Sequence, residues 1–244
     1  IRSFPEGDLN NLGVTALLLP VAEDWANEDL GGTGDWNAAI KLYLLWRDTD
    51  IDFVVFDGPE QSFSLGVDFA KNLAENFEVH GELAFRNDVL RRTADGDRRV
   101  REDRIDGLLG LRWLNAWETT FIAEYYRNGA GYDGAELETF FAASESPLPA
   151  GEMSADPRRE LGKDYFYLKI SQKEPFGILD FTPWIASVVN LRDFSFSVRP
   201  GLTWAPLSDL ELNLRAAIPV GPPRTEFGET PDAFRAEFWA RYYF

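Results

Sequence analysis

Apolar and polar residues alternate along much of the chain. From Phe194 to Trp204 every even-numbered residue is apolar, whereas the odd-numbered residues are serine, arginine, glycine or threonine. The segments 76–86 and 210–218 repeat this pattern. A period of two places successive side chains on opposite faces of a β-strand. The sequence therefore predicts strands that have one apolar and one polar face.

The alternation recurs in about twelve segments, most of them about ten residues long. The predicted strands are residues 11–20, 36–46, 49–57, 62–71, 76–87, 104–114, 117–127, 164–173, 177–190, 194–204, 209–219 and 234–244. Roughly half of the chain would be strand, which is about twice the share in an ordinary globular domain. A closed barrel explains this excess.

Short and long connections alternate along this strand order. The short ones lie near 47–48, 72–75, 115–116, 174–176 and 205–208, and the long polar ones near 21–35, 88–103, 128–163 and 220–233, with short exceptions near 58–61 and 191–193. One end of a barrel would carry tight turns and the other would carry loops, as in outer-membrane barrels with short periplasmic turns. Within the long connections we expect a short helix over 133–144, capped by Asp133, and a solvated loop over the charge run 91–104.

The competing fold is a soluble barrel or sandwich with its apolar face inward. Eight strands already enclose a space that side chains can fill, so about twelve would leave an unpacked void in a soluble barrel. A sandwich escapes this argument and stays open. If the apolar face contacts lipid and the polar face lines the lumen, the pattern needs no further assumption. We therefore predict an all-β, transmembrane, antiparallel up-and-down β-barrel of about twelve strands.

Length and composition narrow the classes of function. The chain has 244 residues, and we expect a single β-barrel domain over 1–244, with strands missing before the abrupt start at Ile1. With no cysteine and one histidine, neither a thiol site nor a histidine-rich metal site has ligands, so we expect no metal and no cofactor. The net charge of −17 makes nucleic acid a poor partner.

The last eleven residues, from Phe234 to Phe244, alternate aromatic with small or charged side chains and finish on phenylalanine. This segment resembles the C-terminal signature of Gram-negative outer-membrane barrels. The resemblance implies an outer-membrane location, the barrel-assembly machinery as a partner, and an assembly signal formed by Phe238, Tyr242 and Phe244. Aromatic residues near strand ends fit a membrane interface, or alternatively cap a soluble core; they are Trp46, Trp113, Trp117, Tyr125, Trp204 and Tyr242.

A second resemblance covers the segments 48–52, 63–73 and 78–82. Together they are similar to a stretch in poorly characterised, porin-like barrels of proteobacteria. That resemblance implies a porin-like protein and brings no active site with it. Those barrels are usually longer than this chain.

Charged residues occupy the polar positions of the predicted strands in nearly balanced numbers. The acids are Asp50, Asp52, Asp68, Glu78, Glu82, Asp106, Glu118, Glu124, Asp180, Glu211 and Glu237, and the bases are Lys41, Arg86, Arg104, Arg112, Lys169, Arg199, Arg215, Arg235 and Arg241. Their distribution along the chain is uneven. An acidic wall would comprise Asp50, Asp52, Asp68, Glu78 and Glu82, and a basic wall Arg199, Arg215, Arg235 and Arg241. In a ring of about twelve strands these walls would face each other and line a pore; alternatively, the charges pair between neighbouring strands and fill a closed lumen.

Two further patterns are candidate sites, one for a cation and one for hydrolysis. Asp48, Asp50 and Asp52 share the spacing of a calcium loop, but Phe53 and Pro59 stand where an EF-hand needs Gly and Glu. A cation site of another kind, between the predicted strands 49–57 and 62–71, stays open.

His80, the single histidine, has Glu78 and Glu82 on the same side of its strand. A turn near Leu73 would place it opposite Gly66, with Ser64 nearby, which would suit a Ser–His–acid hydrolase. Ser64 lies in no nucleophile motif, so we interpret His80 as a lumen residue paired with carboxylates.

These patterns favour a porin-like channel without enzymatic activity, in contact with the lipid bilayer, through which small polar or ionic solutes diffuse passively. Two alternatives stay open. One is an assembly or export scaffold whose barrel binds a partner, and the other, less favoured, is an outer-membrane hydrolase centred on His80.

Overall fold

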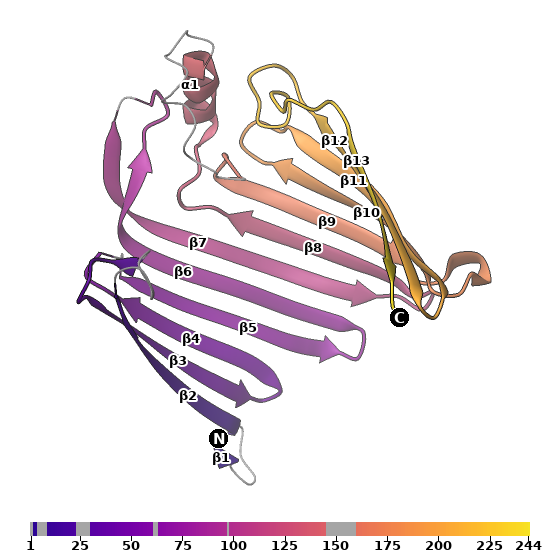
Figure 1. Ribbon diagram of the computed structural model, residues 1–244, viewed down its shortest axis with the longest axis horizontal. Coiled ribbons are helices and arrows are strands. Elements are labelled where there is room, and N and C mark those ends of the chain that lie inside the picture. The colour runs from indigo at the N-terminus through magenta and orange to yellow at the C-terminus, as the bar shows by residue number, and fades with distance from the viewer. Residues whose placement is uncertain (1, 4–8, 23–29, 61–62, 97, 145–159) are drawn as a thin grey trace. The chain divides into compact units, whose positions relative to one another are not determined.

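The computed structural model describes residues 2–3, 9–22, 30–60, 63–96, 98–144 and 160–244. Its strands form a 13-stranded sheet in which the spatial order follows the chain order (Figure 1). The strands are β1 (Arg2–Ser3), β2 (Leu9–Pro20), β3 (Trp36–Trp46), β4 (Thr49–Asp57), β5 (Ser64–Ala74), β6 (Phe77–Arg92), β7 (Arg99–Leu114), β8 (Thr119–Arg127), β9 (Asp164–Gln172), β10 (Phe181–Asn190), β11 (Phe196–Leu207), β12 (Leu210–Val220) and β13 (Arg235–Tyr242). Each predicted strand is present, and β1 is an additional short one. The all-β, antiparallel, up-and-down fold is therefore confirmed, whereas closure into a barrel stays a prediction.

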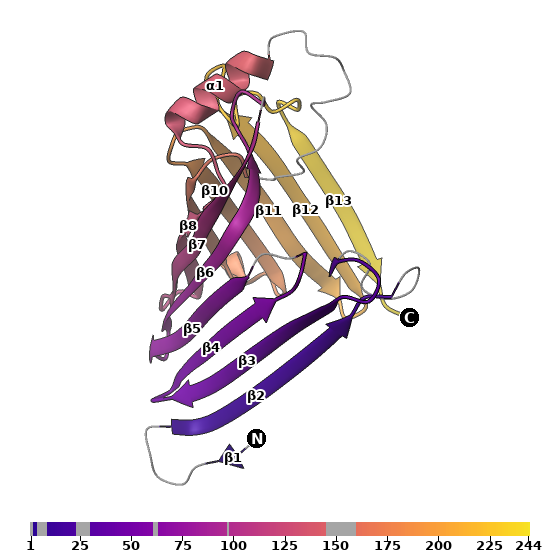
Figure 2. The same ribbon diagram turned by 90° about the vertical axis from the view of Figure 1, so that its left-hand side faces the viewer.

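The chain divides into two compact units. Unit 1 comprises residues 1–93 and 98–109, and unit 2 comprises 94–97 and 110–244. Unit 1 holds β1 to β6 and most of β7, and β2 to β6 lie side by side in it as a meander (Figure 2). Unit 2 holds β8 to β13 and the helix α1 (Gly134–Ser144). In both units consecutive strands are neighbours, so the sheet lacks the crossovers of a Greek-key sandwich.

Strand register sorts the side chains of unit 1 onto two faces. Ile40 of β3 pairs with Val55 of β4, which pairs with Leu65 of β5, which pairs with Phe85 of β6. Residues opposite one another share a face, so these four form one apolar row. We call the face that carries this row the apolar face of unit 1, and the opposite one its polar face. Ile40 is 54% exposed and lies on the apolar face.

Unit 2 has the same two-sided arrangement. Leu202 of β11 pairs with Leu214 of β12, which pairs with Phe238 of β13. This row defines the apolar face of unit 2, where Phe238 is 67% exposed. Among the described residues, far more large hydrophobic side chains are exposed than buried. The strands therefore do not bury their apolar residues in a core of the usual kind.

In the part of the chain that the structure describes, buried hydrophobic residues cluster in one small core beside α1. Leu137 and Phe141 of the helix pack against Tyr132 and Ala94. The helix begins with a capping box, in which the Asp133 side chain accepts a hydrogen bond from the Glu136 backbone N–H and the Glu136 side chain accepts one from the Asp133 N–H. The predicted helix and its Asp133 cap are confirmed. None of the described helices is long and apolar enough to cross a membrane.

The charge run 91–104 is not a solvated loop, as the sequence predicted, but mostly strand. β6 extends to Arg92 and β7 begins at Arg99, so only residues 93–98 connect them. Charged side chains occupy both faces of these strand ends, and some of them pair across the two strands. Arg101 lies 2.6 Å from Asp88, and Arg91 lies 3.4 Å from Glu102. These cross-strand pairs supply the side-chain contacts that apolar residues supply elsewhere in the sheet.

Two acids that the sequence placed on strands lie in turns instead. Glu118 has φ 60° and precedes β8, and Asp180 has φ 53° and precedes β10. Positive φ values belong to turns rather than to strands. By contrast, Arg47 and Asp48, with φ 47° and 55°, form the two-residue connection expected between β3 and β4. A pair of positive φ values matches the twist of a tight hairpin.

Candidate functional site

The acidic wall predicted from the sequence lies on the polar face of unit 1. Asp52 of β4 stands opposite Asp68 of β5, and Asp68 stands opposite Glu82 of β6. Three carboxylates thus form one row across three strands. Asp50 and Glu78 lie on the same face, opposite Ala70 and Asn72 respectively. The structure therefore brings together all five residues of this wall.

Among the described residues, three of these carboxylates have ion-pair or hydrogen-bond partners, whereas Asp68 and Glu82 have none. The Lys41 Nζ lies 2.9 Å from an Asp52 oxygen, and the Tyr43 hydroxyl donates to Asp50 at 2.5 Å. Among the described residues Asp68 has no ion pair or hydrogen bond, although Asp52 and Glu82 flank it. Like charges directly opposite repel, and a carboxylate without a counter-ion is costly away from water. Contact with water would lower this cost.

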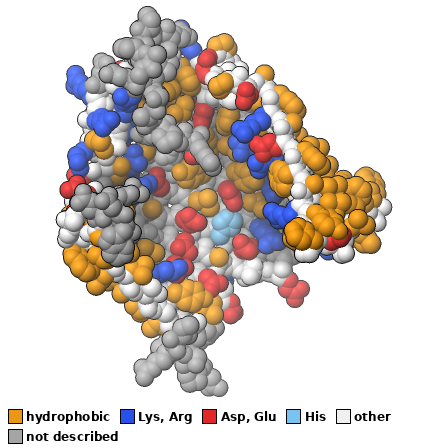
Figure 3. Space-filling view, in the orientation of Figure 1, with side chains coloured by type: hydrophobic (Ala, Val, Ile, Leu, Met, Phe, Trp, Pro, Cys, Tyr) orange, Lys and Arg blue, Asp and Glu red, His pale blue; other side chains and the backbone are white. Residues whose placement is uncertain are grey.

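His80 lies among these acids but not beside the serine that a hydrolase would need. Figure 3 shows acidic side chains gathered around the single histidine, and its Nδ1 lies 3.4 Å from Glu78. The β5–β6 turn comes later than predicted, so His80 stands opposite Ala70 rather than Gly66. Ser64 stands opposite Arg86, six positions away along the strand, or about 20 Å. The expectation that Ser64 lies near His80 is therefore wrong.

The basic wall lies on the polar face of unit 2. Arg215 of β12 stands opposite Glu237 of β13, and Arg235 and Arg241 occupy the same face of β13. Arg199 of β11 stands opposite Ala186, in the same alternation. The four predicted arginines thus share one face, as the sequence predicted.

Three of the four arginines pair with carboxylates. Arg215 lies 2.5 Å from Glu237, Arg235 lies 3.2 Å from the same residue, and Arg241 lies 4.0 Å from Glu211. Arg199 has no carboxylate within ion-pair distance among the described residues; its Nε donates only to the Ser197 hydroxyl, at 3.4 Å. Part of the charge is therefore paired between strands, as a closed lumen would require, and part is not.

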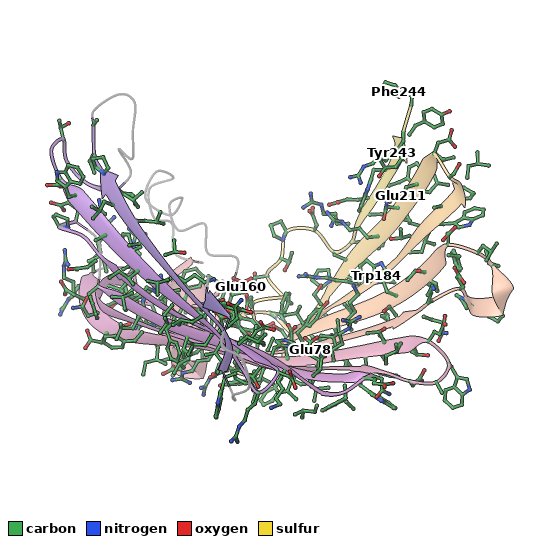
Figure 4. All side chains as sticks on the ribbon, turned by 90° about the horizontal axis from the view of Figure 1, so that it is seen from below. Glu78, Glu160, Trp184, Glu211, Tyr243 and Phe244 are labelled. Atoms are coloured by element: carbon green, nitrogen blue, oxygen red, sulfur yellow. The ribbon has the colours of Figure 1, made fainter. Side chains whose placement is uncertain are left out.

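Two tryptophans on this polar face were not among the residues singled out from the sequence. The Trp184 ring lies across Gly201, where a Cβ atom would overlap the indole, and the Lys169 ammonium lies 5.2 Å from the ring centroid. The Arg215 guanidinium lies 5.0 Å from the Trp239 ring. Figure 4 shows Trp184 and Glu211 on the same side of the unit 2 sheet. The signal was available, because both tryptophans occupy polar positions of the alternation.

The long loop 221–234 is fixed against this face by a buried carboxylate. Glu226 accepts hydrogen bonds from the Tyr165 hydroxyl at 2.7 Å, the Asn190 amide at 2.7 Å and the Leu161 N–H at 3.1 Å. The Glu226 N–H in turn donates to Asp193 at 2.8 Å. Burial raises the pKa of the Glu226 carboxyl above its usual range, although the three hydrogen bonds oppose this shift.

A pocket of about 430 Å³ lies between this loop, α1 and the polar face of β11 to β13. Arg199 and Arg235 reach it from the strands, and Glu229 and Asp232 reach it from the loop. The sequence predicts only a long polar connection over 220–233. Gly221 and Gly228 are a sequence signal of turns within this connection. A Cβ atom at either position would collide with neighbouring atoms, so the loop is closely packed there.

The aromatic residues singled out from the sequence are exposed. Trp46, Trp113, Trp117, Tyr125, Trp204 and Tyr242 are 44%, 42%, 79%, 41%, 36% and 59% exposed. Both interpretations, a membrane interface and the rim of a soluble core, stay predictions. Phe238 and Tyr242 lie on the apolar face of β13, and Tyr243 and Phe244 follow the strand (Figure 4). Recognition of these residues by an assembly machinery stays a prediction.

Comparison with known proteins does not assign the chain to a family. No protein-family model matches the chain, and no curated protein matches it. Among the described residues, no group of three or more histidine, aspartate or glutamate side chains is arranged to hold a metal ion.

Proposed function

We propose that the protein is an outer-membrane β-barrel through which small polar or ionic solutes diffuse passively. The observation that carries the proposal is the exposed apolar face of an up-and-down sheet whose other face is charged. Soluble monomers rarely expose contiguous apolar surface of more than a few hundred Å². Lipid would cover that surface, and closure of the sheet would pair the backbone groups at its edges. In this proposal the polar faces of both units line the lumen.

A hydrated lumen is favoured over a dry one by the charges that lack partners. Among the described residues, Asp68 and Arg199 each lack an ion pair at salt-bridge distance, although the Lys41 charge acts on Asp68 from further away. A closed, ion-paired lumen would have to leave both charges desolvated, at a cost of several kcal/mol per ion. Water in the lumen removes this cost. The unpaired charges therefore support a pore more than a plugged scaffold.

The proposed pore has an acidic wall in unit 1 and a basic wall in unit 2. Because the polar-face charges are nearly balanced, we expect weak ion selectivity. The sharpest variants are Asp68→Asn and Arg199→Gln, since neither breaks an ion pair of the described residues. The reversal potential of the refolded protein in a planar bilayer, under a potassium chloride gradient, measures selectivity. Dilute salt is required, because the screening length is about 30 Å at 0.01 M.

Arg199→Gln should increase cation preference, and Asp68→Asn should shift selectivity toward anions. Arg47→Gln is the matched control, because Arg47 lies in the β3–β4 turn rather than on a strand. We expect this control to change the reversal potential least. Conducting channels with identical selectivity in all variants would contradict the two walls. Silent bilayers with folded protein would reject the pore and favour the scaffold.

The hydrolase alternative is not supported, because Ser64 and His80 are separated along the strands. We propose no enzymatic activity.

A further inference from the structure

The pocket under loop 221–234 is lined by a cation that lacks a carboxylate partner among the described residues. Arg199 lines the pocket, and no carboxylate lies within 4 Å of it among the described residues. Arg235 lines it too, but shares Glu237 with Arg215. A free guanidinium offers two parallel donors that match the geometry of a carboxylate. The strand side of the pocket can therefore bind a carboxylate group.

The loop side of the same pocket holds an anion. Asp232 lines the pocket and has no ion pair or hydrogen bond among the described residues. Glu229 has a hydrogen-bond partner, because one of its carboxylate oxygens accepts the Arg224 N–H at 2.7 Å. Arg199 and Asp232 do not pair with each other, although both line one pocket. Two opposite charges, each without a partner, thus lie apart across the same space.

Apolar groups also line the pocket. Phe141 comes from α1, Phe227 and Pro231 from the loop, and Pro219 from β12. Leu161 completes this apolar lining. The volume of about 430 Å³ is within the range of small-molecule sites. The apolar lining gains free energy only if the ligand has an apolar body to bury.

We infer that this pocket binds a zwitterionic solute with an apolar body, of the size of an amino acid or short peptide. Arg199 holds its carboxylate, Asp232 holds its ammonium group, and the phenylalanine and proline side chains contact its apolar part. The network around Glu226 fixes the loop, so the binding groups are held in place before the solute arrives. As a statement about which solutes the channel passes, this inference rests on the proposed function; binding itself does not require conduction.

Three probes separate the two charges of the ligand. They are the dipeptide Leu-Leu, its N-acetyl form, which lacks the ammonium, and its C-terminal amide, which lacks the carboxylate. Binding to the refolded full chain in detergent is measured by titration calorimetry, with protein-free micelles as blank. We expect saturable binding of Leu-Leu and about tenfold weaker binding of each blocked form, as for the loss of one charged hydrogen bond.

Variants assign the charges to residues. Arg199→Gln should bind Leu-Leu about as weakly as the wild type binds the amide, and should bind the amide with no further loss. Asp232→Asn should bind Leu-Leu about as weakly as the wild type binds the N-acetyl form, and should bind the N-acetyl form with no further loss. Arg112→Gln is the matched control, because Arg112 also lacks an ion pair among the described residues and does not line the pocket.

Equal affinities of the wild type for the three probes would overturn the inference. So would a loss of Leu-Leu affinity in Arg112→Gln as large as that in Arg199→Gln. So would the absence of saturable binding in protein whose circular dichroism shows a folded sheet. Binding with silent bilayers would keep the pocket and reject the channel, whereas conduction without binding would keep the channel and reject the pocket.

Discussion

Single residues decide which face of the sheet tolerates a charge. Leu83 and Ala84 are neighbours on β6, but Leu83 belongs to the apolar face and Ala84 to the polar face, where it stands opposite Gly66. If the apolar face contacts lipid, Leu83→Arg should lower the free energy of unfolding by about 2–4 kcal/mol. Ala84→Arg, the matched control, should cost far less. Denaturant titration in lipid vesicles measures both, and equal costs would contradict the proposed facing.

Gly201 tests how Trp184 is held on the polar face. A Cβ atom at position 201 would overlap the indole ring, so Gly201→Ala should displace Trp184 and cost about 1–3 kcal/mol of stability. The double variant Gly201→Ala with Trp184→Ala should lose less than the sum of the two single variants, because the clash is gone. Tryptophan fluorescence and denaturant titration provide the two readouts. Additive losses would show that the ring and the glycine are independent.

At the scale of an element, loop 221–234 depends on pH through Glu226. Its pKa is raised by burial, so the folded state favours the protonated carboxyl. The stabilisation by protonation is complete below the unfolded pKa and is lost as pH rises through the raised, folded-state pKa. Glu226→Gln keeps an oxygen for Tyr165 and Asn190 but cannot titrate. The melting temperature of the wild type relative to this variant should therefore fall as the pH rises from below the usual carboxyl pKa through the raised pKa of the folded state. A difference that stays constant over this range would rule out the proposed role of Glu226.

The strands could be predicted from the sequence because their signal is local. Each strand of β10 to β12 alternates apolar and polar residues, and this alternation predicts its faces and its approximate position, although the ends of β10 and β11 differ from the prediction by two to four residues. The ends of β6 and β7 escaped prediction because charges occupy both of their faces there. The partners of Glu226 could not be predicted either. Tyr165 and Asn190 lie 61 and 36 positions away in the chain, and no local pattern reports such contacts.

For the whole molecule, the exposed apolar faces of both units determine the solvent that the protein needs. We expect the refolded chain to be monodisperse only in detergent, with mostly β signal in circular dichroism and altered gel migration when it is not heated. The same surface in plain buffer would drive aggregation. A monodisperse monomer in buffer without detergent would contradict the proposed membrane barrel, while leaving the observed sheet unchanged.

The paired charges at the ends of β6 and β7 make this hairpin sensitive to ionic strength. β5 begins at Ser64, opposite Arg86, so the last residues of β6 continue beyond its start. Screening lengths shorten to about 3 Å in molar salt, and exposed pairs weaken first. Arg101 and Asp88 are 64% and 58% exposed, whereas Arg91 is 8% exposed. Added salt should therefore speed amide hydrogen exchange around Arg101 and Asp88 more than around Arg91. The end of this hairpin would then respond to the salinity of its surroundings.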